Sequence, residues 1–165
     1  MQAIKFRYAV AHAFDAPAEA VAGFFGDPMA LAQCTPHVVS ACPVDARTVD
    51  YVLETQRDLG LVFTPRYRLQ YAFETPRTLL WRSVPSAEGN VEIEARVQFI
   101  EQPLQATNVT QVAVEERVSF PLPVTLITAK IVEVIARRQS ANDMSQLLAA
   151  AERALALRLT PVEGS

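Results

Sequence analysis

The sequence has few of the residues and motifs on which several large classes of enzyme depend. Only 5 of its 165 residues are glycine, and it contains no phosphate-cradling glycine loop, dinucleotide-binding glycine pattern or serine-centred nucleophile motif. Its two cysteines, Cys34 and Cys42, lack the paired cysteine or histidine spacing of a zinc site. We therefore expect no cofactor and no metal, and enzyme classes built on those devices are disfavoured.

The sequence also lacks a long hydrophobic run and an excess of one charge. Its longest uncharged run, 28–44, contains three prolines, and the first ten residues place Lys5 and Arg7 among apolar residues. Its 15 basic and 18 acidic residues give a net charge of -3, without a basic cluster that would bind phosphates. These features predict a cytoplasmic protein with no membrane-spanning segment and no nucleic-acid partner.

The composition is that of a protein with a large core. Hydrophobic residues make up 50% of the chain, and a domain of this length buries roughly 70% of the surface that its unfolded chain exposes. We expect one domain over residues 1–165.

The stretch from Asp15 to Val38 predicts two short helices in succession. In each, an aspartate is followed within two residues by a proline, as in Asp15 with Pro17 and Asp27 with Pro28. An aspartate accepts hydrogen bonds from free backbone N–H groups at a helix start, where proline has no N–H to leave unsatisfied. Each aspartate is therefore predicted to cap one helix.

Alternating apolar and polar residues predict strands before and after this helix pair. The expected strands are 4–14, 38–44, 48–57, 61–74, 78–84, 91–102 and 108–120, with short turns between them and a loop starting at Pro103 before the last strand. Pro65 cannot donate a hydrogen bond within a sheet, so it predicts a bulge or a sheet edge in its strand. The short turns predict antiparallel neighbours.

The last part of the chain, 124–159, has helical periodicity. One apolar stripe contains Ile127, Ile131, Val134 and Ile135, and a second contains Met144, Leu147, Leu148, Ala151 and Leu155. The phase changes between the stripes, and Ser140 with Asp143 resembles a capping pair. We therefore expect a kink or break near Ser140.

These elements predict an α+β fold in which a curved antiparallel sheet of about seven strands is covered by one long C-terminal helix. The chain resembles the superfamily of START lipid-transfer domains, polyketide cyclases and the major birch-pollen allergen (SRPBCC), known for its helix-grip fold. The residues that carry this resemblance are Ala16-Pro17, Val21, Asp27-Pro28, Leu31, Pro36, Val38, Glu74, Pro76, Leu79-Leu80-Trp81, Asn108-Val109-Thr110 and 147–154. Two departures are Cys34, where such sequences often have tryptophan, and His37, where glycine is common. The resemblance implies a cavity between sheet and long helix.

Strand parity directs several polar and aromatic side chains toward this expected cavity. The candidate ligand-binding residues are His12, Tyr51, Tyr67, Tyr71, Trp81 and Glu116, and Tyr8, Arg57 and Ser83 share their face. The aromatic residues either fill the core or line a pocket with apolar bodies and polar tips. His12 is either a hydrogen-bonded core histidine or a pocket group, and His37 is expected in a loop near the pocket entrance.

Glu116 is the most informative candidate, because a buried carboxyl group must be paired or protonated. Arg57 has matching parity and is a candidate partner in a structural ion pair. Without a cation partner, Glu116 would have a raised pKa and could act as a general acid or base.

Three functions remain open from the sequence. The first is binding or transport of an apolar or amphipathic small molecule, such as a lipid, quinone or polyketide-like compound, without catalysis. The second is an enzyme resembling polyketide cyclases and aromatases, in which His12, Tyr67 or Glu116 steers enolisation or dehydration. The third is a protein-interaction domain with a filled cavity, and exposed apolar residues in 155–159 would favour it and a homodimer.

Overall fold

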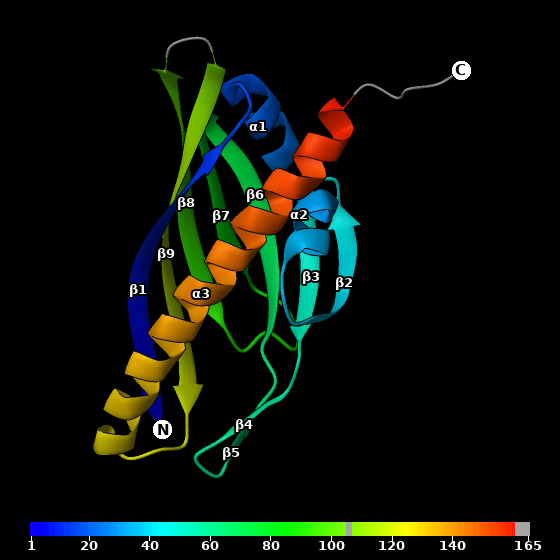
Figure 1. Ribbon diagram of the computed structural model, residues 1–165. Helices are drawn as coiled ribbons and strands as arrows, with labels where there is room; N and C mark the ends of the chain where they lie inside the picture. The colour runs from blue at the N-terminus through cyan, green and yellow to red at the C-terminus, as the bar shows by residue number, and fades with distance from the viewer. Residues whose placement is uncertain (105–106, 161–165) are drawn as a thin grey trace.

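The computed structural model describes residues 1–104 and 107–160 and shows one curved sheet with helices on its concave side (Figure 1). The chain begins with β1 (Gln2–Phe14), α1 (Ala18–Phe25) and α2 (Pro28–Cys34) and ends with α3 (Leu126–Leu159). Between them lie β2 (Val38–Asp45), β3 (Thr48–Leu53), β4 (Gln56–Asp58), β5 (Leu61–Phe63), β6 (Arg66–Thr75), β7 (Thr78–Val84), β8 (Glu92–Leu104) and β9 (Thr107–Leu122). The predicted fold class is confirmed.

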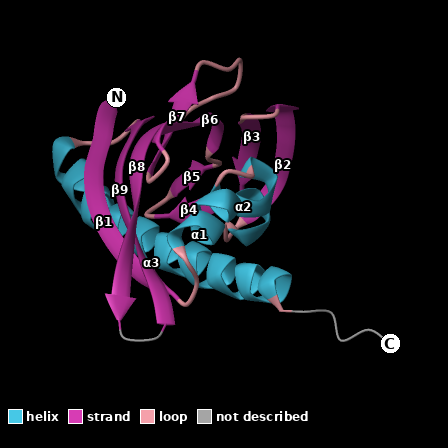
Figure 2. Ribbon diagram, turned by 90° about the horizontal axis from the view of Figure 1, so that it is seen from above, coloured by secondary structure: helices cyan, strands magenta, loops and turns pink. Residues whose placement is uncertain are grey.

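Seven strands form one antiparallel sheet in the order β1-β9-β8-β7-β6-β3-β2. Viewed from above, the strands follow an arc, and α3 crosses its open side (Figure 2). Helix α1 contacts β8 and β9, and α2 contacts β2 and β3 at one end of the arc. The edge strands β1 and β2 do not pair with each other, so the sheet does not close into a barrel. Helix α3 covers its open side instead. No helix among the described residues is long and apolar enough to cross a membrane.

The two short helices begin differently. Asp27 caps α2 as predicted, because its side chain accepts a hydrogen bond from the Ala30 backbone N–H at 3.3 Å. The prediction that Asp15 caps α1 is wrong: the N-cap residue is Pro17, and no side chain caps this helix. The β1 to α1 connection is instead held by buried Thr110, whose hydroxyl donates to the Ala16 carbonyl at 2.8 Å.

The two strands on either side of the 58–60 turn are shorter than predicted. Pro65 interrupts the expected strand 61–74, and Asn90 bridges the break by accepting from the Arg66 N–H and donating to the Thr64 carbonyl, both at 2.8 Å. β4 and β5 therefore form a separate hairpin that projects from the sheet (Figure 1). Arg57 lies exposed in this hairpin, so its predicted inward position is wrong.

Helix α3 is continuous, and the predicted break near Ser140 is wrong. Its cap is Thr125, whose hydroxyl accepts from the Thr128 N–H at 3.2 Å. One inward face, spaced by three or four residues, runs along the whole helix through Ala129, Val132, Ala136, Ser140, Met144, Leu147, Ala151 and Leu155. The apparent change of phase arises because the first predicted stripe faces outward: Ile127, Ile131, Val134 and Ile135 are exposed.

Two further expectations concern the β8–β9 connection and the end of α3. Strands β8 and β9 extend to Leu104 and from Thr107, and residues 105–106 of the predicted loop lie outside the described residues. Near the end of α3, Leu155 is buried whereas Leu157 and Leu159 are exposed. The homodimer that such exposure would favour stays a prediction.

Phenylalanine side chains fill the core beneath α1. Phe25 is fully buried, with its ring centroid 5.9 Å from that of Phe14 and 5.3 Å from that of Phe99. Phe24 packs against Phe25 at 6.2 Å, and the Arg158 guanidinium of α3 lies 4.8 Å from the centre of the Phe24 ring. This end of the core is closed, so any cavity must lie toward the other end of the sheet.

Candidate functional site

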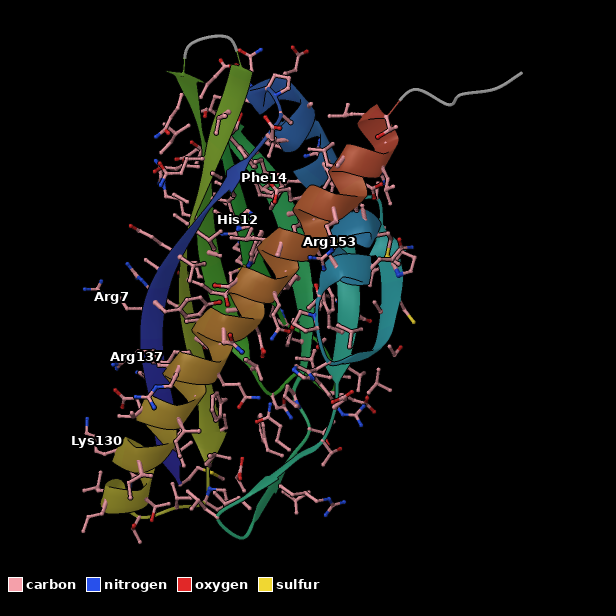
Figure 3. The ribbon with its side chains drawn as sticks, in the orientation of Figure 1. Arg7, His12, Phe14, Lys130, Arg137 and Arg153 are labelled. Carbon is pink, nitrogen blue, oxygen red and sulfur yellow. The ribbon has the colours of Figure 1, made fainter. Side chains whose placement is uncertain are left out.

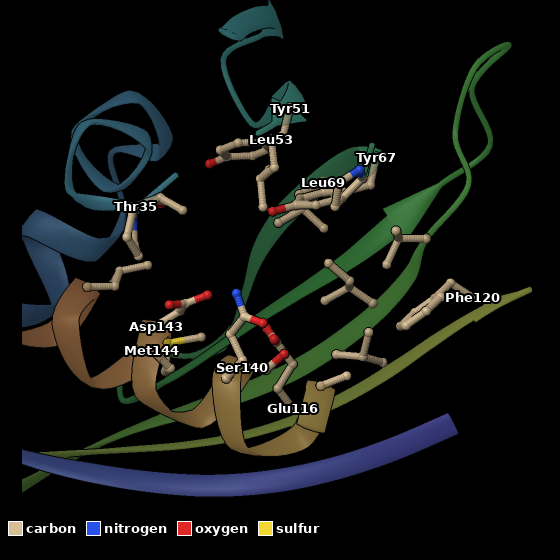
Figure 4. Close-up of a pocket in the computed structure, with 18 of the residues that line it drawn as sticks. Thr35, Tyr51, Leu53, Tyr67, Leu69, Glu116, Phe120, Ser140, Asp143 and Met144 are labelled. Carbon is tan, nitrogen blue, oxygen red and sulfur yellow. The ribbon is translucent and has the colours of Figure 1, made fainter. Parts of the chain in front are cut away.

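A cavity of about 170 Å³ lies between the concave face of the sheet, helix α2 and the middle of α3 (Figure 4). Its lining residues include all four tyrosines and the only tryptophan of the chain. The polar or ionisable lining residues are Tyr8, Thr35, Tyr51, Gln56, Tyr67, Tyr71, Trp81, Glu116, Gln139, Ser140 and Asp143. Apolar residues such as Leu53, Leu69, Ile93 and Met144 make up most of the remainder.

Glu116 lies in a row of paired residues that crosses five strands. Strand register places Tyr8, Glu116, Ala95, Trp81 and Tyr71 side by side on β1, β9, β8, β7 and β6. Because Ala95 is small, the Trp81 indole reaches across it, and its Nε1–H donates to Glu116 Oε2 at 2.9 Å. The Tyr8 hydroxyl donates to Glu116 Oε1 at 2.6 Å.

The carboxyl group of Glu116 is buried without a cation beside it. Burial raises its pKa, and the hydrogen bonds from Tyr8 and Trp81 oppose this shift only in part. Arg57, the candidate partner considered from sequence, does not contact it, so the ion-pair alternative does not hold. Glu116 therefore has the raised pKa that the sequence predicts for a Glu116 without a cation partner.

The tyrosines of the cavity are protonated donors. Tyr51 and Tyr71 share a hydrogen bond between their hydroxyl groups at 2.6 Å, and burial raises the pKa of Tyr51 to about 12. The Tyr67 ring stacks on Tyr51 with centroids 5.2 Å apart, and burial raises the pKa of Tyr67 as well. Tyr67 and one member of the Tyr51–Tyr71 pair can donate a hydrogen bond to a ligand, and none of these three phenols can act as a base near neutral pH.

Tyr67 and Asp143 present polar groups to the cavity from opposite sides. The Tyr67 hydroxyl makes no hydrogen bond to another described residue, and Figure 4 shows it directed toward the cavity from β6. Asp143 projects from α3 into the same space (Figure 4). Its side chain is 27% exposed, and burial raises its pKa, with the nearby His37 opposing the shift.

His37 connects the edge of the sheet to α3 beside the cavity. Its Nδ1 lies 3.2 Å from Glu54 Oε2, and its Nε2 lies 3.5 Å from Asp143 Oδ1. The residue has a positive φ of 64°, a conformation that is uncommon for residues other than glycine but is enriched in histidine, asparagine and aspartate. His37 is therefore a loop residue that contacts a cavity-lining carboxylate from outside.

The structure brings five of the six predicted ligand-binding residues to the cavity: Tyr51, Tyr67, Tyr71, Trp81 and Glu116. His12 does not line it. His12 lies half-buried beside α3 (Figure 3), and its Nε2 lies 3.0 Å from Glu152 Oε1. It is therefore a hydrogen-bonded histidine at the margin of the core. Ser83, which shares the predicted face, accepts a hydrogen bond from the Ile93 N–H at 2.9 Å.

Sequence reasoning missed Asp143, Gln139 and Ser140 as lining residues. The sequence instead predicts a helix cap at Ser140 and Asp143, because these polar residues lie between the two apolar stripes of 124–159. Their spacing to Met144 and Leu147 is the available signal, since residues three, four and seven apart share a helix face. Among the residues that the structure describes, no group of three or more potential ligands is placed to hold a metal ion.

Comparison with known proteins identifies the fold. No family model matches the sequence, and no curated protein matches it. A structure from Thermus thermophilus aligns with a TM-score of 0.72 at 16% identity, over 94% of this chain and 100% of that one. A START superfamily protein from Mycobacterium smegmatis aligns with a TM-score of 0.66 at 14% identity, over 93% and 99%.

The Zhui aromatase/cyclase of a Streptomyces species also aligns, with a TM-score of 0.64 at 16% identity over 98% of this chain and 99% of that one. Identities this low show the fold alone. The chain therefore has the helix-grip fold that the resemblance in sequence implied, a fold shared by a START superfamily protein and an aromatase/cyclase.

Proposed function

We propose that this protein binds an apolar or amphipathic small molecule in the cavity between the sheet and α3. The observation that supports this most directly is the distribution of the aromatic residues: all four tyrosines and the tryptophan line this cavity. Apolar walls with a few convergent polar groups are the usual construction of a small-molecule site.

The size of the cavity limits the ligand. Its volume of about 170 Å³ is close to that of an engineered apolar cavity of about 150 Å³ that holds benzene. A molecule of about one ring fits without rearrangement, whereas a long-chain lipid requires the cavity to open. Among the lipid, quinone and polyketide-like classes, the proposal therefore favours a ring compound or the ring end of a larger one.

Native mass spectrometry of the freshly purified protein tests this proposal. A mass that is lost on denaturation and identified after organic extraction would reveal the ligand class directly. A protein without added mass would next be titrated with fluorescent apolar probes. Failure of these probes as well would contradict the proposal.

Two alanine variants on α3 provide a matched test of location. Ala136 lines the cavity, so Ala136→Phe is expected to fill part of it and to weaken probe binding at least tenfold. Ala156 is exposed on the same helix and lies outside the lining, so Ala156→Phe should bind as the wild type does. Equal binding by both variants would place the probe elsewhere.

A second function, of the aromatase/cyclase kind, is supported by the convergence of polar groups. Such chemistry needs at least two polar groups on one cavity, and Glu116, Asp143 and the Tyr67 hydroxyl all meet there. A carboxylate could remove a proton from the carbon beside a carbonyl while the Tyr67 hydroxyl donates to the oxygen that becomes the enolate.

Hydrogen exchange in a small cyclic ketone tests the second function. Cyclohexanone in deuterated water should exchange the hydrogens beside its carbonyl faster with the protein than with buffer, as followed by NMR. Glu116→Gln and Asp143→Asn identify the base, since only the loss of the base should abolish the acceleration. An exchange rate equal to that of buffer would contradict the second function, and ligand binding without catalysis would then be the proposed function.

A further inference from the structure

The cavity lining contains acidic residues but no basic residue, a feature on which the proposed function does not depend. Its lining contains two carboxyl groups, those of Glu116 and Asp143, but no lysine, arginine or histidine. The nearest histidine contact is His37 Nε2, 3.5 Å from Asp143 Oδ1 on the outer side of that carboxylate. No positive group of the lining is therefore available to pair with a bound anion.

Of the two carboxyl groups in the cavity, that of Asp143 is the one available to accept a hydrogen bond from a ligand. Glu116 already accepts from Tyr8 at 2.6 Å and from Trp81 at 2.9 Å, so each of its oxygens has a donor from the protein. Asp143 accepts no hydrogen bond shorter than its 3.5 Å contact with His37 among the described residues. Its carboxylate is the acceptor that a ligand can use.

The Tyr67 hydroxyl complements this acceptor. It has no partner among the described residues and faces the cavity from the strand opposite α3. A hydroxyl group on a ligand ring can donate to Asp143 and accept from Tyr67, so both protein groups are satisfied at once. The ring itself would lie against the stacked Tyr51 and Tyr67 side chains, whose centroids are 5.2 Å apart.

We propose that the cavity takes ring compounds that bear a hydrogen-bond donor and carry no negative charge, and that it excludes carboxylates and phosphates of the same size. This inference rests on the proposed binding function and specifies its ligand. An anion would lose its water in a lining that offers no positive group to pair with it, and an ionised Glu116 or Asp143 would repel it more strongly than in water. A phenol or hydroquinone meets no such repulsion.

Two probes with the same ring skeleton test this selectivity at neutral pH: p-cresol, which is uncharged, and p-toluate, which is an anion. Trp81 is the only tryptophan, and its indole N–H contacts Glu116, so its fluorescence and its indole NMR signal report on the cavity. We expect p-cresol to bind at least about tenfold more tightly than p-toluate. Equal or tighter binding of p-toluate would overturn the inference while leaving the binding function standing.

Neutral variants identify the groups that exclude the anion. Asp143→Asn and Glu116→Gln should each reduce the preference for p-cresol at least about threefold, mainly by strengthening p-toluate binding. Glu115 lies on the opposite, exposed side of the same strand, so Glu115→Gln removes an equal charge and should leave the preference unchanged. A preference unchanged in all three variants would overturn the assignment to Glu116 and Asp143.

The same experiment separates failure of the inference from failure of the function. If neither probe alters the Trp81 signals although the fluorescent apolar probes bind, the proposed ligand class is contradicted and the binding function stands. If the fluorescent probes fail to bind as well, both the binding function and its selectivity are contradicted. If both probes bind with equal affinity, only the selectivity is contradicted. Thermal unfolding of each variant checks that the substitution leaves the protein folded.

Discussion

The two ends of the core are built from different aromatic residues. Beneath α1, Phe14, Phe24, Phe25 and Phe99 are almost completely buried and in ring-to-ring contact. Toward the other end, the four tyrosines and Trp81 surround about 170 Å³ of space. One sheet and one helix thus cover a filled half and a hollow half.

The difference shows how polar tips keep part of a core open. A phenylalanine ring can be enclosed on all sides, whereas a buried hydroxyl or indole N–H requires a partner. The Tyr8 and Trp81 tips converge on Glu116, and the Tyr51 and Tyr71 hydroxyls pair with each other. These hydrogen bonds hold the aromatic side chains in place around the cavity, so the side chains do not collapse into it.

Truncating one phenylalanine at each end should give the largest contrast. Phe25→Ala at the filled end is expected to lower the free energy of unfolding by about 3–5 kcal/mol, because it creates a cavity in closely packed surroundings. Phe63 is only partly buried and already lines the hollow end, so Phe63→Ala should cost less than about half as much. Urea unfolding measures both, and equal costs would contradict the comparison.

Removing the acceptor at the hollow end should be the next largest effect. Glu116→Leu leaves the Tyr8 hydroxyl and the Trp81 N–H without their acceptor, at a cost of about 1–3 kcal/mol for each buried donor. Glu116→Gln retains an amide oxygen for Trp81, and the Tyr8 hydroxyl can turn to accept from the amide. We therefore expect the glutamine variant to be clearly more stable than the leucine variant in urea unfolding.

The pH dependence of stability tests the charge state of Glu116. Because its pKa is raised in the folded protein, its contribution to stability is complete below the unfolded pKa and is lost as pH rises through the folded pKa. The stability of Glu116→Gln relative to wild type should therefore increase as the pH rises above the ordinary glutamate pKa of 4.5. Glu115→Gln is the control, and an unchanged difference for Glu116→Gln would show an ordinary pKa.

The two aspartates before the short helices provide a smaller test. Asp27 caps α2, which contributes Leu31 to the cavity, and Asp27→Ala is expected to cost about 1 kcal/mol. Asp15 caps no helix, so Asp15→Ala should change the free energy of unfolding by less than about 0.5 kcal/mol. Similar losses in both variants would contradict the assignment of the caps.

The smallest expected effect on stability is that of Tyr67→Phe. The hydroxyl has no partner among the described residues, so its removal should change stability by less than about 0.5 kcal/mol. Binding of p-cresol should weaken several-fold, because one hydrogen bond to the ligand is lost. A large loss of stability would show that the hydroxyl has a structural partner.

Several features of the site were predictable because they depend on strand parity. The period of two placed Tyr51, Tyr67, Tyr71, Trp81 and Glu116 on the inward face, and all five line the cavity. The alternating pattern gave the wrong side for Arg57, because β3 ends at Leu53 and Arg57 belongs to the separate hairpin that begins at Gln56. For His12 the parity was correct, but the residue lies beyond the hollow part of the core.

Helix α3 shows where sequence pattern was misleading. Its most apolar stripe, with Ile127 and Ile131, faces away from the protein, while small residues such as Ala129 and Ala136 face the sheet. Small side chains allow the helix to approach the sheet closely, and Ser140 and Asp143 are inward because they border the cavity. Hydrophobicity alone therefore assigned the wrong face to the first half of the helix.

By itself, the sequence determined the order of the helices and of the seven sheet strands, the antiparallel pairing, the long terminal helix and the inward face of each regular strand, because these follow from local periodicity and turn residues. Only the tertiary structure decided which part of the core stays hollow and which groups meet there. Glu116 finds its partners on strands 108 and 35 residues away, and Asp143 reaches the cavity from a helix that crosses the sheet. Such contacts depend on the curvature of the sheet and the path of α3, which no local pattern encodes.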